Sequence, residues 1–401
     1  MPDQPSESRA FPWFGLIVLA AAVFMSVTNE MLPTGLLQPM SRELGVSEPQ
    51  IGLLLSVFAG TVVLSSIPLA GLTRRLPRHG LLVTVLIALA ASNLLSAVAP
   101  TYELLVAARV FGGLTHAMFW IIVAAYAGHL VPRHQLGRAV AITASGGTLA
   151  YIFGVPLGTM LGQWLGWRLT WVTLAVLTAL AAVLVLKFLP PVARETETHA
   201  TRVPLRRDAT LPAVVIVCLV TGIIMTGHYA FYTYIAPFVT DVLALPESMI
   251  GVMLGVFGAG GAIGIVLVGT VLGRRPTGAV IGLLVSVGIA VAVLAVSTES
   301  LPIAVTAFAV WGIAFGALPS LLNTRLLQVA SARARDVASA FYNSAFNLGI
   351  GGGALLGAVL FDSVGVAQLP WLYIGTLLLA LAVLGGTVWW RRSRAPEIIT
   401  R

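Results

Sequence analysis

Long apolar segments separated by short polar turns run along the whole chain. A helix needs roughly 20 mainly apolar residues to cross about 30 Å of hydrocarbon, and each segment reaches that length. In lipid, only a helix or a closed barrel satisfies its own backbone hydrogen bonds. The pattern therefore predicts twelve transmembrane helices, at 12–37, 50–71, 81–99, 102–128, 137–161, 167–189, 211–240, 249–272, 278–297, 301–328, 337–361 and 368–390.

The second half of the chain repeats the first after a shift of 199 residues. The stretch Glu-Pro-Gln-Ile-Gly at 48–52 aligns with Glu-Ser-Met-Ile-Gly at 247–251. Tandem helical bundles related by an axis along the membrane normal are typical of transporters whose halves rock against each other. The same offset carries Pro77 onto Pro276, Gly113 onto Gly312, Gly154 onto Gly353 and Gly158 onto Gly357.

One long polar connection, at 190–210, separates the two repeats. It begins with two prolines and continues with acidic and basic residues, whereas the other turns are short. We therefore expect an all-α integral membrane protein with twelve transmembrane helices in two pseudo-symmetric six-helix bundles. The bundles are residues 1–189 and 211–401, and the connection between them is a cytoplasmic linker.

Composition excludes a soluble fold and several kinds of chemistry. Charged residues make up 9% of the chain and the mean hydropathy is +0.96, whereas soluble domains carry about 25% charged residues. The single cysteine, Cys218, excludes an intrachain disulfide and a multi-cysteine metal cluster. The sequence also lacks the phosphate-binding loop of ATPases and the motifs of zinc and serine hydrolases. We therefore expect neither an enzyme nor an ATP-driven pump.

The basic residues mark one side of the membrane. With a cytoplasmic N-terminus, all but three of the 23 lysines and arginines fall in inner segments; the exceptions are Arg42, Arg109 and Arg168. This asymmetry follows the positive-inside rule. It predicts a multi-pass protein of the cell (plasma or inner) membrane with both termini in the cytoplasm. The net charge of +8 is thus topological and gives no support for nucleic-acid binding.

Four ionisable residues lie inside the predicted spans, away from their ends: Glu30, Arg109, His116 and His228. Each such group is costly in hydrocarbon and needs a function or a partner. Desolvation favours the protonated form of a carboxyl group, so Glu30 is predicted to take up and release a coupling proton. The alternative is a structural acid, hydrogen-bonded to a neighbouring helix or paired with Arg109.

Arg109 opens a polar stripe on the fourth span. His116 lies two helical turns further on and Trp120 one turn beyond it, so the three share a face. Because arginine stays charged, Arg109 requires a counter-ion, carbonyl groups or a wet cavity. It can serve Glu30, an anionic substrate or a purely structural ion pair. We expect Arg109 to take part in proton coupling and His116 and Trp120 to line the substrate cavity.

The first span of each half places polar residues at the same depth. The offset maps Asn29 onto His228 and Glu30 onto Tyr229. Histidine titrates near neutral pH, so His228 is predicted to join the proton coupling; a hydrogen-bonded helix contact is the alternative. The remaining predicted cavity residues are Asn29, Tyr229, Tyr232, Asn343 and Asn347.

Glycines cluster in the fifth and eleventh spans. In the fifth, Gly154, Pro156 and Gly158 follow one another closely. Small residues let membrane helices approach each other, and a proline permits a bend. Static packing explains such a face, but the repeat of these glycines in both halves favours faces that slide and tilt during gating.

From about Phe14 to Trp390 the chain resembles the major facilitator superfamily, specifically its drug:proton antiporter branch, which includes sugar-efflux and arabinose-efflux permeases. The resemblance implies alternating access driven by a proton gradient. It is carried by Thr28-Asn29-Glu30-Met31 in the first span, Arg109-x-x-Gly112-Gly113 in the fourth, Gly154-Val155-Pro156-Leu157-Gly158 in the fifth and Gly227-His228-Tyr229-Ala230 in the seventh.

The loop after the second span departs from the superfamily pattern, which contains an aspartate between two glycines. Here residues 71–79 read Gly-Leu-Thr-Arg-Arg-Leu-Pro-Arg-His and contain no acid. We expect Asp336, near the start of the eleventh span, to supply the missing carboxylate at the cytoplasmic gate. Its predicted partners are Arg74, Arg75 or Arg78.

Together these features predict a monomeric, proton-coupled secondary transporter that exports a small organic molecule, either a drug or a sugar, across the lipid bilayer. The proton gradient drives it and no cofactor is expected. One alternative is a proton symporter or a facilitator for uptake. The other is a membrane sensor or scaffold with a degenerate transporter fold.

Overall fold

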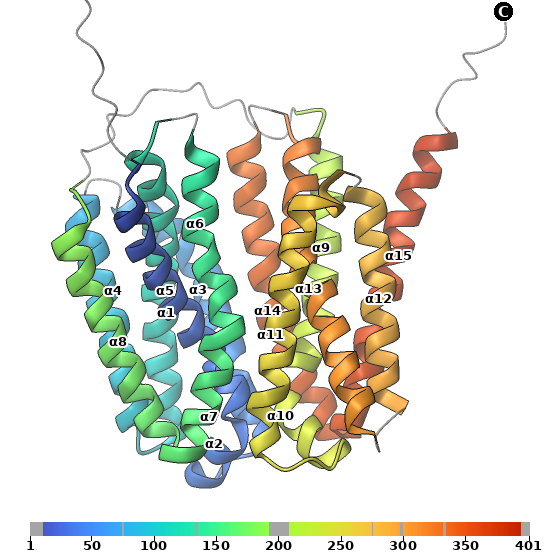
Figure 1. The fold of residues 1–401 in the computed structure, drawn as a ribbon, viewed down its shortest axis with the longest axis horizontal. Coiled ribbons are helices and arrows are strands. Elements are labelled where there is room, and N and C mark those ends of the chain that lie inside the picture. Colours follow the sequence, from blue (N-terminus) through green and yellow to red (C-terminus); the bar gives the residue numbers. More distant parts are fainter. Residues whose placement is uncertain are drawn as a thin grey trace, which may run out of the picture.

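The computed structural model describes residues 11–73, 76–132, 135–191, 208–274, 276–296, 300–331 and 334–393. Within these ranges, 12 helical spans are long and apolar enough to cross a membrane, which confirms the predicted all-α fold (Figure 1). The first half contains α1 (Trp13–Gly35), α2 (Leu37–Leu44), α3 (Glu48–Thr73), α4 (Arg78–Val98), α5 (Tyr102–Leu130), α6 (Leu136–Leu149), α7 (Val155–Leu165) and α8 (Trp167–Phe188). The second half contains α9 (Leu211–Tyr232), α10 (Ile235–Pro237), α11 (Ser248–Thr270), α12 (Pro276–Val296), α13 (Leu301–Val329), α14 (Arg335–Val364) and α15 (Leu369–Ser393).

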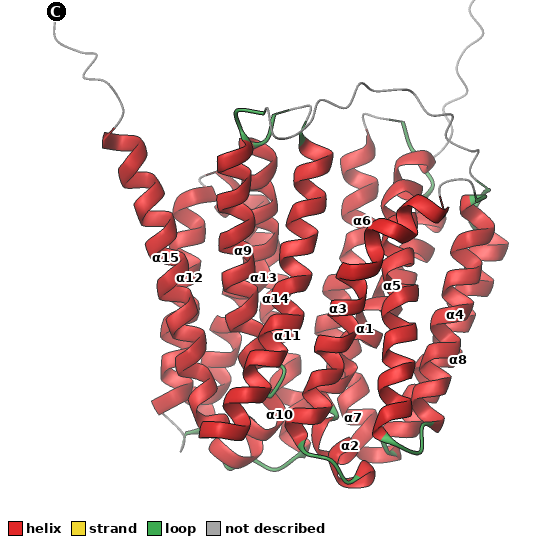
Figure 2. Cartoon of the chain, turned by 180° about the vertical axis from the view of Figure 1, so that it is seen from behind, coloured by secondary structure: helices red, strands yellow, loops and turns green. Residues whose placement is uncertain are grey.

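The even number of spans puts the start of α1 and the end of α15 at one end of the molecule (Figure 1). We call this the terminal end. The short helices α2 and α10 lie at the opposite end, which we call the α2 end (Figure 2). The predicted helix at 211–240 is wrong in its last turns, because α9 stops at Tyr232. A turn, α10 and a π-helical turn at Phe238–Val242 follow.

The helices repeat with the same 199-residue offset as the sequence. Helix α5 (Tyr102–Leu130) corresponds residue for residue to α13 (Leu301–Val329). Before the last span of each half, the chain turns at Gly166 and Gly365, whose φ angles are 85° and 87°. Glycine adopts a positive φ without a steric penalty, so both halves make the same turn with the same residue.

The fifth span of the first half differs from its counterpart. Helices α6 and α7 are joined by a π-helical turn at Ala150–Gly154, whereas α14 is one continuous helix. Pro156, the second residue of α7, has no N–H for the Ile152 carbonyl oxygen. The chain widens here, and the Val155 N–H bonds back to the Ala150 carbonyl oxygen. The proline and the local widening therefore occur together in this span.

The glycines of this span pack against α1 inside the first half. A Cβ at Gly154 would collide with the Thr28 hydroxyl, and a Cβ at Gly158 with the Leu32 side chain. Pro156 lies on the other side, where its Cβ is 3.9 Å from a Cβ built on Gly255 of α11. The glycines therefore allow close packing within one half, and the proline faces the other half.

Hydrogen bonds between the halves, among the described residues, run from the α2 end to mid-depth. The Gln38 amide donates to the Thr240 hydroxyl at 2.7 Å, and the Arg42 guanidinium bonds to the Glu247 carboxylate at 2.6 Å. The deepest of these contacts joins the hydroxyls of Tyr151 and Tyr229, 2.7 Å apart. The α2 end is thus the closed end of the molecule.

Along one face of α14, side chains become more exposed toward the terminal end, where the halves separate. Gly351 packs against α3, where a Cβ would lie 3.3 Å from Ala59. One turn nearer the terminal end, Asn347 is partly exposed, and one turn further Asn343 is exposed. The interface between the halves therefore opens toward the terminal end.

Candidate functional site

A proline in α1 frees a backbone acceptor deep in the first half. Pro33 lies inside α1 and has no N–H, so the carbonyl oxygen of Asn29, four residues earlier, lacks its helical donor. Both Asn29 and Glu30 are buried. An unpaired carbonyl in such a place is costly, and a partner from another helix is required.

Arg109 of α5 supplies that partner. Its Nη1 donates to the Asn29 carbonyl at 3.0 Å and to Asn29 Oδ1 at 3.1 Å. Its Nη2 donates to the backbone carbonyl of Glu30 at 3.1 Å. The guanidinium also lies over the ring of Phe58, 4.2 Å from its centroid, and near Trp171. The hydrogen bonds of Arg109 therefore go to the α1 backbone and to Asn29 rather than to the Glu30 carboxylate.

The carboxylate of Glu30 faces His116 instead. Its Oε2 lies 3.5 Å from His116 Nε2. Its Oε1 is buried and has no hydrogen-bond partner in the described part of the chain. Glu30 thus keeps one oxygen beside a titratable ring and a second oxygen free to accept a proton.

The surroundings of His116 fix its tautomer. Trp120 Nε1, which can only donate, lies 2.9 Å from His116 Nε2, so this nitrogen is the acceptor. His116 Nδ1 lies 2.9 Å from Ser26 Oγ and carries the ring hydrogen in the neutral form. The lone pair of Nε2 therefore points toward both the indole N–H and the Glu30 carboxylate. A proton placed between Glu30 and His116 competes with the Trp120 hydrogen bond.

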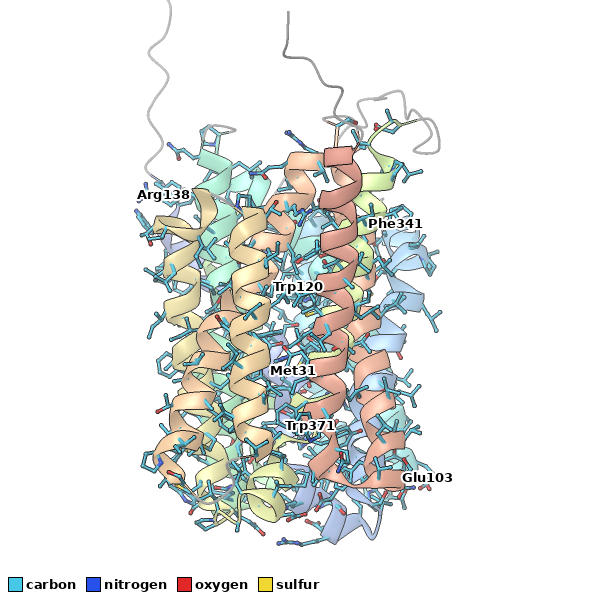
Figure 3. All side chains as sticks on the ribbon, turned by 90° about the vertical axis from the view of Figure 1, so that its right-hand side faces the viewer. Met31, Glu103, Trp120, Arg138, Phe341 and Trp371 are labelled. Carbon is cyan, nitrogen blue, oxygen red and sulfur yellow. The ribbon has the colours of Figure 1, made fainter. Side chains whose placement is uncertain are left out.

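Trp120 lies at the boundary of this buried cluster. It is 38% exposed, whereas Glu30 and His116 are buried. Figure 3 shows Trp120 between Met31 and the terminal end, while Glu103 marks the α2 end. The partly exposed indole thus lies on the terminal-end side of the buried acid–histidine pair.

Two tyrosines join the cluster to the second half. The hydroxyls of Tyr151 and Tyr229 share a hydrogen bond, and the π-helical turn that carries Tyr151 packs against α1, the helix of Glu30. The predicted cavity residue Tyr229 is therefore part of the contact between the halves. The phenol pair is neutral, so it can hydrogen-bond to a substrate as well as to itself.

His228 lies among aromatic rings in the second half. Its ring stacks on Phe315 with centroids 3.4 Å apart and on Tyr232 at 5.1 Å. Trp311 and Tyr373 lie edge-on to it. Both imidazole nitrogens and the Tyr232 hydroxyl are buried without hydrogen-bond partners among the described residues. The structure thus places His228 in an aromatic cluster, separate from the Glu30–His116 pair.

The remaining predicted residues lie nearer the terminal end or outside the described ranges. Asn347 Nδ2 donates to the Asn343 carbonyl at 3.0 Å, so the pair shares a face of α14. Arg74 and Arg75 lie outside the described residues, as does the side chain of Asp336. The predicted gate pairing of these residues stays a prediction.

Sequence reasoning missed three members of the cluster. Ser26 lies one turn before Asn29 and Glu30, and this spacing was the available signal. Phe58 stood in the repeated segment, and Tyr151 stood in the glycine-rich fifth span. No pattern in the chain indicates that Tyr151 meets Tyr229, because that contact depends on how the halves pack. Among the described residues, no three His, Cys, Asp or Glu side chains gather as a metal site.

Comparison with known proteins agrees with this architecture. The sequence model of the Major Facilitator Superfamily matches residues 19–353. A "Probable sugar efflux transporter" from Mannheimia succiniciproducens is 32% identical over 373 residues, which cover 93% of this chain and 92% of that protein.

Two solved structures share the fold. Both are of a bacterial homologue of the human lysosomal transporter Spinster. The inward-facing, occupied structure has a TM-score of 0.74 at 16% identity and covers 96% of this chain and 98% of the other. The inward-facing, unoccupied structure has a TM-score of 0.70 at 19% identity and covers 95% of each chain. This chain belongs to the major facilitator superfamily and is a membrane transporter rather than an enzyme.

Proposed function

We propose that this transporter exports small sugars in exchange for incoming protons. The observation that carries the proposal is the buried Glu30–His116 pair, 3.5 Å apart, beside an arginine whose hydrogen bonds go elsewhere. A carboxylate held in a permanent ion pair would stay ionised throughout the transport cycle. Glu30 has an unpartnered oxygen and a neighbouring base, which is the arrangement that a coupling proton requires.

The orientation follows from the charges. The basic loops of the sequence lie on the side of the termini, and the positive-inside rule assigns that side to the cytoplasm. The terminal end is then cytoplasmic, the host membrane is the cell (plasma or inner) membrane, and this conformation is open inward. Substrate enters past Asn343, Asn347 and Trp120, while Glu30 releases its proton to the same side.

The substrate and the proton compete for the central site, and this competition couples sugar export to proton entry. A substrate that hydrogen-bonds to Trp120 or to the Tyr151–Tyr229 pair rearranges the groups around Nε2 of His116. Substrate and proton then favour opposite states, and each lowers the affinity for the other, as linkage requires. In the reverse step the outward-open state releases substrate and Glu30 takes a proton from outside.

Two arguments favour a sugar as the substrate: the chemistry of the second half, and the name of the relative from Mannheimia succiniciproducens. Sugars present hydroxyls together with apolar C–H faces. The aromatic cluster around His228 offers ring faces, and its buried His228 and Tyr232 carry polar atoms without partners. The relative's name points the same way. An amphipathic drug fits the rings but leaves more of these polar atoms unpaired.

Proteoliposomes test the proposal. L-arabinose or lactose is added outside vesicles that contain a pH-sensitive dye, and the pH of the lumen is followed. Antiport drives protons out and makes the lumen alkaline. Symport makes it acidic, a facilitator leaves it unchanged, and a sensor or scaffold moves no sugar.

Glu30→Gln separates coupling from transport. This variant is expected to abolish the pH change while exchange of labelled sugar continues. Glu103→Gln removes an exposed carboxylate at the α2 end and serves as the matched control, with normal coupling expected. If sugar makes the lumen of Glu30→Gln vesicles as alkaline as that of vesicles with the parent protein, the coupling role is excluded.

A further inference from the structure

Two donors share one acceptor, the Nε2 atom of His116. In a neutral imidazole one nitrogen donates and the other accepts, and the indole N–H of Trp120 occupies this acceptor at 2.9 Å. The Glu30 carboxyl group lies 3.5 Å from the same atom and, when it is protonated, becomes the second donor. While the indole N–H is in place, a proton on Glu30 therefore has no acceptor on His116.

The other contacts of the His116 ring hold this acceptor in place. Nδ1–H donates to the Ser26 hydroxyl oxygen at 2.9 Å, and both residues are buried. The Phe58 ring of α3 lies edge-on to the imidazole, with 5.1 Å between the ring centroids. The ring is thus held from α1 and from α3, and Nε2 stays between the indole and the carboxyl group.

A molecule that enters from the terminal end can reach the indole but not the pair behind it. Trp120 is 38% exposed, whereas Glu30 is 5% and His116 2% exposed. Figure 3 places Trp120 on the terminal-end side of Met31, the residue that follows Glu30. The contact between Trp120 and His116 is therefore the part of this cluster that an entering substrate meets first.

We propose that the indole N–H of Trp120 blocks proton transfer from Glu30 to His116, and that a substrate removes the block by accepting this N–H. A sugar hydroxyl or ring oxygen has the lone pair that this requires, whereas a C–H surface has none. We call the hydrogen bond between Trp120 and His116 the indole lock. The indole lock rests on the proposed coupling role of Glu30, because it acts on the proton of that residue.

Once the lock is open, the proton moves in two steps. Nε2 of His116 takes the proton from the Glu30 carboxyl group, which leaves a carboxylate beside an imidazolium. The imidazolium then gives the proton from Nε2 to water at the terminal end, and the neutral ring keeps its Nδ1–H on Ser26. Arg109, two turns earlier on α5, also carries a positive charge, and like charges disfavour each other, so the imidazolium is short-lived. Substrate binding thus triggers proton release on the side from which the substrate came.

The rate of proton release without sugar tests the indole lock. Protein in nanodiscs is equilibrated in mild acid and mixed rapidly with a weakly buffered alkaline solution that contains a pH-sensitive dye. The release phase that is absent from Glu30→Gln belongs to Glu30. Trp120→Phe keeps an aromatic ring but lacks the N–H, so this phase should be roughly two- to tenfold faster than in the parent, the factor that corresponds to one hydrogen bond. Trp120→Met also lacks the N–H and is the second variant if Trp120→Phe folds poorly.

A matched control, a relay variant and added sugar sharpen the test. Trp164→Phe removes an indole N–H from an exposed position of α7 and should release protons at the parent rate. His116→Gln removes the relay, so adding Trp120→Phe to it should give no acceleration. L-arabinose or lactose should speed release from the parent by about the same factor as Trp120→Phe does, and should not speed Trp120→Phe further.

Equal release rates in the parent and in Trp120→Phe, without sugar, would overturn the indole lock. Acceleration that persists in the His116→Gln background would overturn it as well, because the proton would then reach water without the ring. Sugar-driven alkalinisation of proteoliposomes is a separate measurement, so export can hold while the lock fails. If Trp120→Phe is fast but no sugar speeds the parent, the lock holds and the choice of a sugar is wrong.

Discussion

The two halves have corresponding helices, but the side chains in their interiors differ in chemistry. In the first half, Arg109 and His116 of α5 meet Glu30 of α1. The 199-residue offset places Phe308, Phe315 and Tyr229 at the equivalent positions of the second half. Where the first half buries a cation, an imidazole and a carboxylate, the second stacks aromatic rings around His228.

The difference indicates a division of labour. Ionised groups in hydrocarbon are costly, and the described part of the chain buries its charged cluster once, in the first half. The second half offers neutral rings and unpartnered hydroxyl and imidazole groups, which suit an uncharged ligand. The halves meet at the Tyr151–Tyr229 hydrogen bond. A rearrangement of side chains in one half can therefore alter the other half through this bond.

The largest expected effect comes from making the first half resemble the second. Arg109→Phe copies Phe308, but it leaves the Asn29 and Glu30 carbonyls without a donor and Glu30 without a nearby cation. Each buried carbonyl group left without a donor costs about 1–3 kcal/mol. We expect a lower unfolding temperature in detergent and no proton-driven export. Phe308→Leu, a change within the apolar counterpart, is the control. Normal export by Arg109→Phe would contradict the division of labour.

A smaller effect separates the packing of the two halves. Gly154 and Gly353 are equivalent, but an added Cβ meets different obstacles. At Gly154 it collides with the Thr28 hydroxyl, and at Gly353 with the backbone carbonyl of Thr226. Overpacking costs about 1–3 kcal/mol, and a backbone obstacle yields less than a side chain does. We expect Gly353→Ala to be the more destabilising change in thermal unfolding.

A second substitution tests whether the obstacle at Gly154 is a side chain and the obstacle at Gly353 is backbone. Thr28→Ala removes the hydroxyl that blocks Gly154→Ala, so the double variant should recover part of the lost stability. No side-chain change removes the carbonyl at Gly353. Equal losses in the two single variants, or no recovery in the double variant, would show that packing is alike in both halves.

The twelve spans and the buried polar stripe could be predicted from sequence because apolar length and helical spacing are local properties. His116 and Trp120 do contact each other on one face of α5, as their spacing indicated, but the contact between His116 and Glu30 was not predicted. The partners of Arg109 could not be predicted in the same way. They depend on Pro33, whose missing N–H frees a carbonyl that only a neighbouring helix can reach.

The break after Tyr232 was missed for a related reason. Residues 233–242 are still mainly apolar, so hydropathy alone continues the helix. The structure ends α9 there and places Thr240 and Asp241 against the first half. Contacts between halves are long-range, and neither composition nor period encodes which residues meet.

The smallest expected effect concerns a contact that only the first half has. Glu43 accepts hydrogen bonds from Trp167 and Arg168, and Arg168 Nη1 also donates to the Ala97 and Ala99 carbonyls. The equivalent positions of the second half, Val242, Val366 and Ala367, carry no charge. Because the ion pair is partly exposed, Glu43→Gln should cost only about 0.2–1 kcal/mol. Its amide oxygen can still accept a bond, and the carbonyl contacts of Arg168 persist. Thermal unfolding at low and high salt measures the cost, which should shrink as salt screens the pair. A loss as large as that of Arg109→Phe would mean that this surface clamp, and not the buried cluster, dominates the asymmetry between the halves.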